Sequence, residues 1–245
     1  ASSSHGSLAS DLLNSAASPE NVPVIVPGMP SAFSADVIAC TAWPSEAPCA
    51  RSKLMVAAGN WSWWATESGA LMCSNRAEIL DIYAALAKSG LVGLPLNYRL
   101  APMEISELIK AMGATALICE ARFGSVLEHL RSHAPEVRHV LWIGPDVPQG
   151  CASYEGLMER ASDTEPSIET DEHSAYYFNL TSGTTGLPKS YVLTQYSACT
   201  LHAPLLAQDA TPGDVNLTIF PAFGRVGLGS LLMSLVMGAR NVLAN

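Results

Sequence analysis

Apolar and polar positions in the middle of the chain follow two alternating patterns. In three stretches the apolar residues recur three and four positions apart, which predicts three amphipathic helices. Short apolar runs between and after them predict buried strands. This alternation predicts an α/β fold, with layered, mostly parallel sheets and helices on both faces. The predicted helices span 75–90, 102–113 and 123–130, and the predicted strands span 91–96, 115–119 and 139–143.

Four of these helix ends carry recognisable signals. Asn75 and Glu78 have the spacing of a capping box, which predicts the start of the first helix. Pro102 opens the second helix, since proline suits the first helical turn. Gly90 and Gly113 follow the first and second helices, where glycine accepts the left-handed conformation that ends many helices.

The last third of the chain continues the pattern without an internal repeat. Two β-prone segments, 176–180 and 191–193, flank a stretch rich in glycine and hydroxyl groups, so we expect that stretch to be a loop between two strands. Two further helices and two further strands follow. The helices are predicted at 195–208 and 226–238, and the strands at 215–220 and 241–243.

Two other segments lack regular periodicity. Residues 1–22 are rich in Ser, Ala and Asn and are predicted to form a loose lead-in. Residues 163–172 carry several carboxylates. The alternatives for these carboxylates are a metal site and an acidic, solvated linker ahead of the glycine-rich loop, and the linker is the favoured interpretation.

The glycine-rich loop itself has the chemistry of a polyphosphate site. Glycines let the backbone approach a ligand closely, N–H groups and hydroxyls donate to phosphate oxygens, and a lysine adds positive charge. The spacing excludes a Walker-type loop, because Pro188 interrupts it and no Gly-Lys-Ser/Thr follows. A surface hairpin is the alternative, but it would not require the lysine. The candidate phosphate-binding residues are Thr181, Ser182, Gly183, Thr184, Thr185, Gly186 and Lys189.

Composition narrows the partners and the compartment. The chain has 245 residues, 49% of them hydrophobic, enough for a sizeable core. A net charge of −9 argues against nucleic acid as a partner. The cysteines form no Cys-x-x-Cys pair and suit a reducing cytoplasm. The apolar tract 226–239 is shorter than the ~20 residues of a membrane span, so no transmembrane segment is expected.

The loop closely resembles the phosphate-binding signature of the acyl-adenylate-forming enzymes, Thr/Ser-Ser-Gly-Thr-Thr-Gly-x-Pro-Lys-Gly. Eight positions match in order, and Ser190 stands where the family usually has glycine. Further blocks resemble those of acyl-CoA synthetases. These blocks are Asn-Arg-Ala-Glu at 75–78, Ala-Lys-Ser-Gly at 87–90, Pro-Leu-Asn-Tyr-Arg-Leu at 95–100, Gly-Ala at 113–114, and Phe-Pro-Ala-Phe at 220–223 with Gly227.

Three departures from the family pattern stand out. Gly224 and Gln195 each replace a histidine that is common in these enzymes. Residues 31–69 lack the amphipathic helix that the family places there. Two explanations remain open for this segment: a local frame error or variant exon that ends near Ala70, or ordinary divergence. A nucleotide read of the region would separate them.

The resemblance implies an acid–thiol ligase that activates a fatty or other carboxylic acid with ATP as acyl-AMP and transfers it to coenzyme A. It implies that residues 23–245 form part of the N-terminal AMP-binding domain. The catalytic residues and the C-terminal domain are expected beyond Asn245. The alternative is a non-catalytic, nucleotide-binding fragment or remnant.

The resemblance also assigns the remaining candidate residues. Mg²⁺ is expected near Thr184 or Thr185, without a dedicated protein metal site. Residues 226–243 are expected to expose apolar surface and to favour self-association. The candidates for the wall of the acyl pocket are Phe223, Gly224, Arg225 and Gly227.

Overall fold

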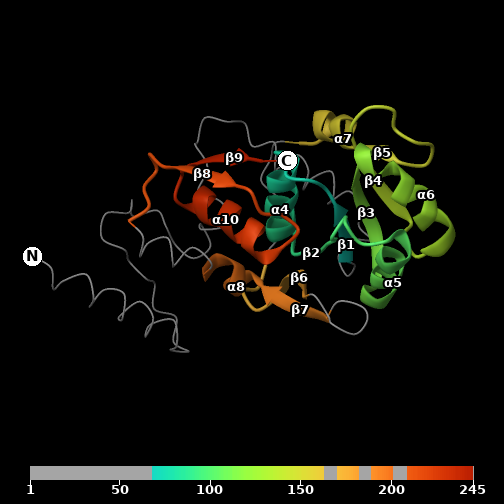
Figure 1. Cartoon of the computed structure of the whole chain (residues 1–245), viewed down its shortest axis with the longest axis horizontal. Coiled ribbons are helices and arrows are strands. Elements are labelled where there is room, and N and C mark those ends of the chain that lie inside the picture. Colours follow the sequence, from blue (N-terminus) through green and yellow to red (C-terminus); the bar gives the residue numbers. More distant parts are fainter. Residues whose placement is uncertain (1–67, 163–169, 182–188, 201–208, 245) are drawn as a thin grey trace, which may run out of the picture.

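The structure is a computed structural model that describes residues 68–162, 170–181, 189–200 and 209–244. Among these residues, seven strands form one sheet in the order β5-β4-β3-β1-β2-β6-β7, and the pairs are parallel except β6–β7 (Figure 1). The strands are β1 Ser68–Met72, β2 Val92–Pro95, β3 Ala114–Glu120, β4 His139–Ile143, β5 Ala152–Ser153, β6 Ala175–Thr181 and β7 Lys189–Thr194.

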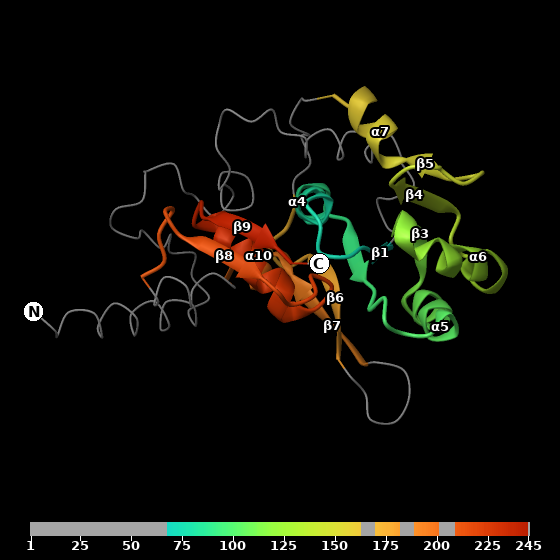
Figure 2. The same ribbon diagram turned by 45° about the horizontal axis from the view of Figure 1, so that its top comes forward.

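Helices cover both faces of this sheet, which confirms the predicted fold class. Figure 2 shows α5 and α6 on the side of the sheet away from α4. The core is divided in the same way: side chains of α4 and α7 join one buried cluster, and those of α5 and α6 join the other. The helices on the two faces of this sheet are α4 Glu78–Ser89, α5 Pro102–Met112, the 3₁₀ turn η2 Ala121–Phe123, α6 Gly124–His133 and α7 Tyr154–Arg160.

Both faces of the sheet are apolar. Neighbouring positions of a strand point to opposite faces, so consecutive apolar residues line both. In β1, Leu71 belongs to the cluster under α4, whereas Ala70 and Met72 belong to the cluster under α5. Parallel strands buried on both faces read as continuous apolar runs in sequence. This is why the sequence pattern of β2, β3 and β4 predicts them well.

The ends of α5 follow their sequence signals. Pro102 occupies the first turn, and a Glu104 carboxylate oxygen accepts a hydrogen bond from the Ala101 N–H at 2.8 Å. Gly113 has a φ of 64° and donates its N–H to the carbonyls of Ile109 and Lys110. Gly90 ends α4 in the same left-handed region, with a φ of 68°.

The predicted capping box at the start of α4 is wrong. The residue before the helix is Ala77, and no side chain caps the first turn. The Glu78 carboxylate pairs with Arg76, and the Asn75 carboxamide binds residues far away in sequence. A local ion pair therefore uses the Glu78 side chain, and long-range contacts use that of Asn75.

Other boundaries also differ from the expectations. β1 and the unit β5–α7 were not predicted, and β1 begins inside the segment 31–69 that lacked a recognisable pattern. Ser153 starts α7, since its Oγ accepts a hydrogen bond from the Gly156 N–H at 3.1 Å. The helix predicted at 195–208 is described as α8 Gln195–Cys199, and residues 201–208 lie outside the described residues.

A second, two-stranded parallel sheet packs on α10. Its elements are β8 Val215–Thr218, α10 Arg225–Val236 and β9 Arg240–Leu243. Leu228 and Leu231 of α10 join the core cluster of α4, which ties this unit to the main sheet. Polar contacts connect the unit internally, because the Asn216 carboxamide binds both Ser230 and Asn241.

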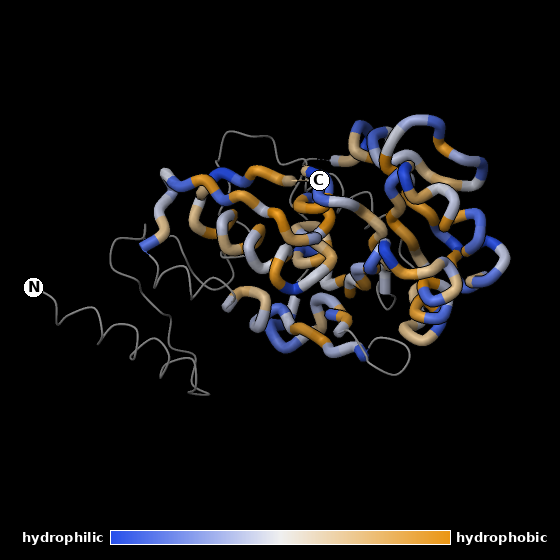
Figure 3. Tube along the Cα trace, in the orientation of Figure 1, coloured by the Kyte–Doolittle hydropathy of each residue, from blue (hydrophilic) through white to orange (hydrophobic). Residues whose placement is uncertain are grey.

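Apolar residues recur along β8 and β9 at the surface (Figure 3). Val215, Leu217 and Ile219 are each more than half exposed, and Val242 of β9 is 44% exposed. The most exposed large apolar side chains of this unit thus lie at 215–220 and at Val226 and Val242, so the exposed apolar surface includes part of the predicted range 226–243 and begins ahead of it. No helix within the described ranges combines the length and the apolar character that a membrane crossing would need.

Candidate functional site

The candidate site lies at the carboxyl edge of the main sheet. Strands β1, β2, β3 and β6 run parallel, so their C-terminal ends share this edge. From β1 the chain goes to β2 on one side and later to β3 on the other side. In open α/β sheets, ligands bind at the carboxyl ends of the strands near such a change of direction.

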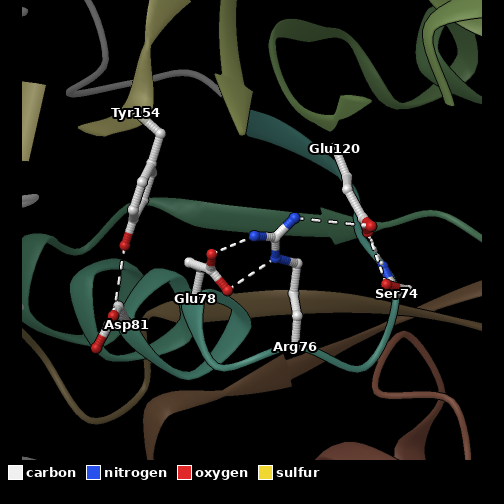
Figure 4. Close-up of polar contacts among 6 residues, drawn as sticks. All are labelled: Ser74, Arg76, Glu78, Asp81, Glu120 and Tyr154. Carbon is white, nitrogen blue, oxygen red and sulfur yellow. Dashed lines mark hydrogen bonds and ion pairs between the residues drawn. The ribbon is translucent and has the colours of Figure 1, made fainter. Parts of the chain in front are cut away.

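A partly buried ionic cluster connects the ends of β1 and β3 (Figure 4). One carboxylate oxygen of Glu120 accepts hydrogen bonds from the Ser74 N–H at 2.8 Å and the Ser74 hydroxyl at 2.7 Å. The other oxygen lies 3.6 Å from a guanidinium nitrogen of Arg76. Arg76 also pairs with Glu78, which lowers the pKa of that carboxyl. The cluster holds residues 74–78 rigidly at the edge of the sheet.

Asn75 connects this edge to the candidate acyl segment. Its Nδ2 donates to the carbonyls of Phe220 at 3.0 Å and Ala244 at 2.9 Å. Its Oδ1 accepts from the Ala222 N–H at 2.8 Å. The carboxamide is buried, and the contacts span 145 residues or more of sequence. Segment 220–222 is thereby fixed to the end of β1.

An aromatic group supports the same segment from the end of β2. The ring of Tyr98 stacks on Phe123 and meets the edge of Phe223, each with a centroid distance of 5.0 Å. Tyr98 belongs to the block 95–100 that resembles acyl-CoA synthetases, but its aromatic contacts could not be read from that block. The structure thus adds Asn75, Tyr98 and Glu120 to the residues that shape this edge.

Three of the four predicted acyl-pocket residues occupy the start of α10 and the turn before it. Phe223 is half-buried against Tyr98, whereas Arg225 is exposed and forms no ion pair with another described residue. Gly224 has an extended backbone with φ −97° and ψ 155°, which any residue can adopt. A Cβ there would meet only the Pro221 carbonyl, at 3.5 Å. Gly224 therefore leaves open space that a side chain could fill.

Gly227, the fourth residue, has a packing role. A Cβ at this position would lie 2.2 Å from the Pro221 carbonyl oxygen and 2.6 Å from that of Phe220. Only glycine lets the first turn of α10 approach the turn at 220–221 so closely. This explains the spacing between the Phe-Pro-Ala-Phe block and Gly227 by a backbone contact.

A buried hydroxyl lies beside this segment. Tyr177 of β6 is fully buried, and its hydroxyl has no hydrogen-bond partner among the described residues. Burial raises the pKa of this hydroxyl, and the charge of Arg225 acts in the opposite direction. Tyr177 and Arg225 therefore influence each other across the boundary between the main sheet and α10.

The two described residues of the predicted phosphate loop lie at its base. Thr181 and Lys189 face each other across the antiparallel pair β6–β7, and the Thr181 hydroxyl donates to the Lys189 carbonyl at 3.1 Å. The two strands predicted on either side of this stretch are confirmed. Both residues are exposed at the carboxyl end of β6. Ser182, Gly183, Thr184, Thr185 and Gly186 lie outside the described residues, so their roles stay predictions.

Thiols at this edge are not suited to nucleophilic chemistry. Burial raises the pKa of Cys119 to about 12, and it raises that of Cys73 further above the usual range. A thiol with such a pKa is protonated and unreactive near neutral pH. Within the described part of the chain, no group of three or more His, Cys, Asp or Glu side chains could hold a metal ion.

Comparison with known proteins identifies the class. The family model described as AMP-binding enzyme matches residues 66–245, so the chain belongs to this family of AMP-binding enzymes. The match includes β6, the glycine-rich loop, β7 and the segment 220–227. It therefore covers both parts of the candidate site.

Individual relatives agree with this class. The chain is 32% identical over 158 residues to an indoleacetate–CoA ligase of Aromatoleum aromaticum, covering 64% of this chain and 31% of the relative. It is 31% identical over 173 residues to a long-chain-fatty-acid–CoA ligase of Mycobacterium tuberculosis, covering 69% and 33%. The chain thus spans about a third of the length of these curated relatives.

Solved structures share the fold. The inhibitor-bound N-terminal domain of FACL13 from Mycobacterium tuberculosis matches with a TM-score of 0.71 at 24% identity, over 80% of this chain and 48% of that one. An anthranilate–CoA ligase bound to anthranoyl-AMP matches with a TM-score of 0.76 at 20% identity, over 89% and 46%. These likenesses show the same arrangement of the sheet and its helices.

Proposed function

We propose that this chain forms part of an acid–thiol ligase, which activates a carboxylic acid with ATP and transfers the acyl group to coenzyme A. One observation carries the proposal. The hairpin that bears the phosphate-loop sequence ends at the same sheet edge to which Asn75 and Tyr98 hold the segment 220–223. An anion loop and an acid-binding segment carried by the same sheet edge suit the joining of a phosphate to a carboxylate.

The reaction would have two steps. In the first, a carboxylate oxygen attacks the α-phosphorus of ATP, the bond to the β-phosphate oxygen breaks, and pyrophosphate leaves. In the second, the thiol of coenzyme A attacks the acyl carbon, loses its proton, and AMP leaves with the former carboxylate oxygen. The first step depends mainly on positioning and charge stabilisation. These are the contributions that a donor-rich loop can make.

Within this scheme, the loop hydroxyls and N–H groups would bind the β- and γ-phosphates, and Lys189 would neutralise the charge that builds up on pyrophosphate. Mg²⁺ would screen the phosphate charge when bound, with Thr184 or Thr185 as the expected protein contact. Lys189 is exposed at the base of the loop, so its amine is free to reach an incoming phosphate.

The acid would lie along 223–227. Open space at Gly224 favours an acid with a bulky group, and the exposed Arg225 favours one with a polar or negative group. The relatives named above act on indoleacetate and on long-chain fatty acids, and a matching structure contains anthranoyl-AMP. Those acids, with crotonobetaine and carnitine from a further group of relatives, form the panel to test.

We expect Arg225→Ala to change substrate preference. The ratio of kcat/KM for a dicarboxylic acid over the alkyl acids of the panel should fall at least about tenfold, because a guanidinium can only donate and a hydrogen bond to a charged group contributes about 1.5 to 3 kcal/mol. Acid-dependent exchange of pyrophosphate into ATP measures this ratio. Arg160→Ala, on α7, is the control. An unchanged acid profile in Arg225→Ala would refute the role.

The alternative is a nucleotide-binding remnant without turnover. Exchange of labelled pyrophosphate into ATP separates the two, because it requires reversible acyl-AMP formation and does not require coenzyme A. Exchange that depends on an acid of the panel supports the ligase. ATP binding without exchange for any acid supports the remnant.

We infer that the exposed face of β8 and β9 favours self-association, since apolar patches of this kind mark contact surfaces. Leu217→Lys should then weaken dimerisation at least about tenfold, because a charge would be buried in the contact. Sedimentation velocity over a concentration series measures the dissociation constant. Val147→Lys, at another exposed apolar position, is the control. A wild-type protein that stays monomeric throughout the series would contradict the inference.

A further inference from the structure

We propose that Asn75 is a positioning residue: its carboxamide fixes the backbone at Phe220–Ala222 and so determines where Phe223 and Arg225 lie. This role rests on the proposed function, because that function makes 220–225 the acid-binding segment. The contacts themselves do not depend on the reaction. They can therefore be tested separately.

All polar atoms of the Asn75 carboxamide are engaged. The residue is 7% exposed, and both N–H groups and the carbonyl oxygen have backbone partners at 2.8 to 3.0 Å. The orientation follows from the partners, since the Ala222 N–H can only donate and the two carbonyls can only accept. A buried, fully bonded carboxamide holds its partners in one geometry.

Neither aspartate nor alanine provides the same contacts. Aspartate has nearly the same shape, but its carboxylate would place an acceptor against the carbonyls of Phe220 and Ala244. Alanine would leave those carbonyls and the Ala222 N–H without partners. Aspartate and alanine therefore disturb the segment in two different ways, one by repulsion and one by loss of contact.

The residues on both sides of Asn75 are held in place by hydrogen bonds and ion pairs of their own. The residue before it, Ser74, donates its backbone N–H and its hydroxyl to Glu120, and the residue after it, Arg76, pairs with Glu78 and Glu120 (Figure 4). The backbone that carries the carboxamide is thus held on both sides. A movement of segment 220–222 relative to the main sheet requires these contacts or those of Asn75 to break.

The held segment leads directly into α10. The Gly224 N–H donates to the Pro221 carbonyl at 3.0 Å, and the Leu228 N–H donates to the Gly224 carbonyl at 3.0 Å. The Tyr83 hydroxyl donates to the Ala222 carbonyl at 3.2 Å. A shift at 220–222 is therefore passed on to Phe223 and Arg225 through short backbone connections.

Kinetics of the variants Asn75→Asp and Asn75→Ala test this role. We expect the KM for the acid in pyrophosphate exchange to rise about 10- to 100-fold, the order that a misplacement of about 1 Å causes. The KM for ATP should change less than about twofold, since the β6–β7 hairpin does not contact Asn75 through any of its three hydrogen bonds. A general loss of folded protein would lower kcat alone and leave both KM values unchanged.

Hydrogen–deuterium exchange gives a readout without turnover. In both variants, the peptide covering 219–228 should exchange at least about tenfold faster, because buried hydrogen bonds of the segment are lost. Peptides of β3 and β4 should keep their protection. Ser153→Ala, which removes the cap of α7, is the control and should leave 219–228 unchanged.

The outcomes separate the two proposals. Faster exchange at 219–228 together with a raised KM for the acid supports the positioning role. Unchanged exchange of 219–228 in both variants overturns it, as does an equal rise of the two KM values. If the wild-type protein shows no pyrophosphate exchange with any acid, the proposed function fails, and the deuterium exchange still decides whether Asn75 fixes the segment.

Discussion

Gly227→Ala is expected to lower the free energy of unfolding by about 3 kcal/mol. The added Cβ would lie 2.2 Å from the Pro221 carbonyl oxygen, well inside van der Waals contact, and the obstacle is backbone. Either α10 or the turn at 220–221 must move. Because Asn75 and Tyr98 hold that turn, the movement would disturb the candidate acyl segment as well. Urea denaturation measures the change in stability.

Gly229→Ala is the matched control, since Gly229 lies on the same helix and an added Cβ there has open space around it. Alanine favours a helix over glycine, so this variant should gain about 0.5 to 1 kcal/mol of stability. The two variants make the same chemical change with opposite expected signs. Equal effects from both would show that helix propensity, and not the contact with Pro221, determines the result.

Lys189→Ala is expected to lower acid-dependent pyrophosphate exchange roughly 100-fold or more, the usual loss when one group that stabilises developing charge is removed. The stability of the fold should hardly change, because the side chain of Lys189 is exposed at the base of the hairpin. Its carbonyl contact with Thr181 belongs to the backbone and remains. Initial rates over a range of ATP concentrations would separate binding from turnover.

Lys110→Ala, on the exposed side of α5 shortly before β3 begins, removes the same charge outside the hairpin and is the control. Its exchange rate should match that of the wild type. A similar loss in both variants would indicate that the overall charge of the protein, and not the loop, governs the rate. Full activity in Lys189→Ala would show that Lys189 does not take part in phosphate binding.

The elements that could be predicted from sequence are those whose pattern is local. Helices α4, α5 and α6 show their apolar faces within about three turns. Gly90 and Gly113 mark the ends of two of them, because glycine readily adopts the left-handed backbone conformation found there. β1 could not be predicted in this way. Its sequence is Ser-Gly-Ala-Leu-Met, and it is a strand because β2 and β3 pair with it on both sides.

The residues of the candidate site differ in the same way: local sequence predicts some of them and not others. The residues of the predicted phosphate loop are contiguous in sequence, so their composition and spacing are enough to predict it. The contact of Asn75 with Phe220 joins residues 145 positions apart, and nothing next to Asn75 indicates it. The local spacing instead suggests a cap for α4. Tertiary structure decides which of the two uses of the carboxamide occurs.

Acid-dependent exchange of labelled pyrophosphate into ATP tests the central claim most directly. Label from pyrophosphate enters ATP in an acid-dependent way only when an acyl-adenylate forms reversibly. The account predicts that label enters ATP with at least one acid of the panel, that it does not enter without acid, and that Lys189→Ala suppresses it. A folded protein that binds ATP but shows no exchange with any acid would contradict the assignment as a ligase.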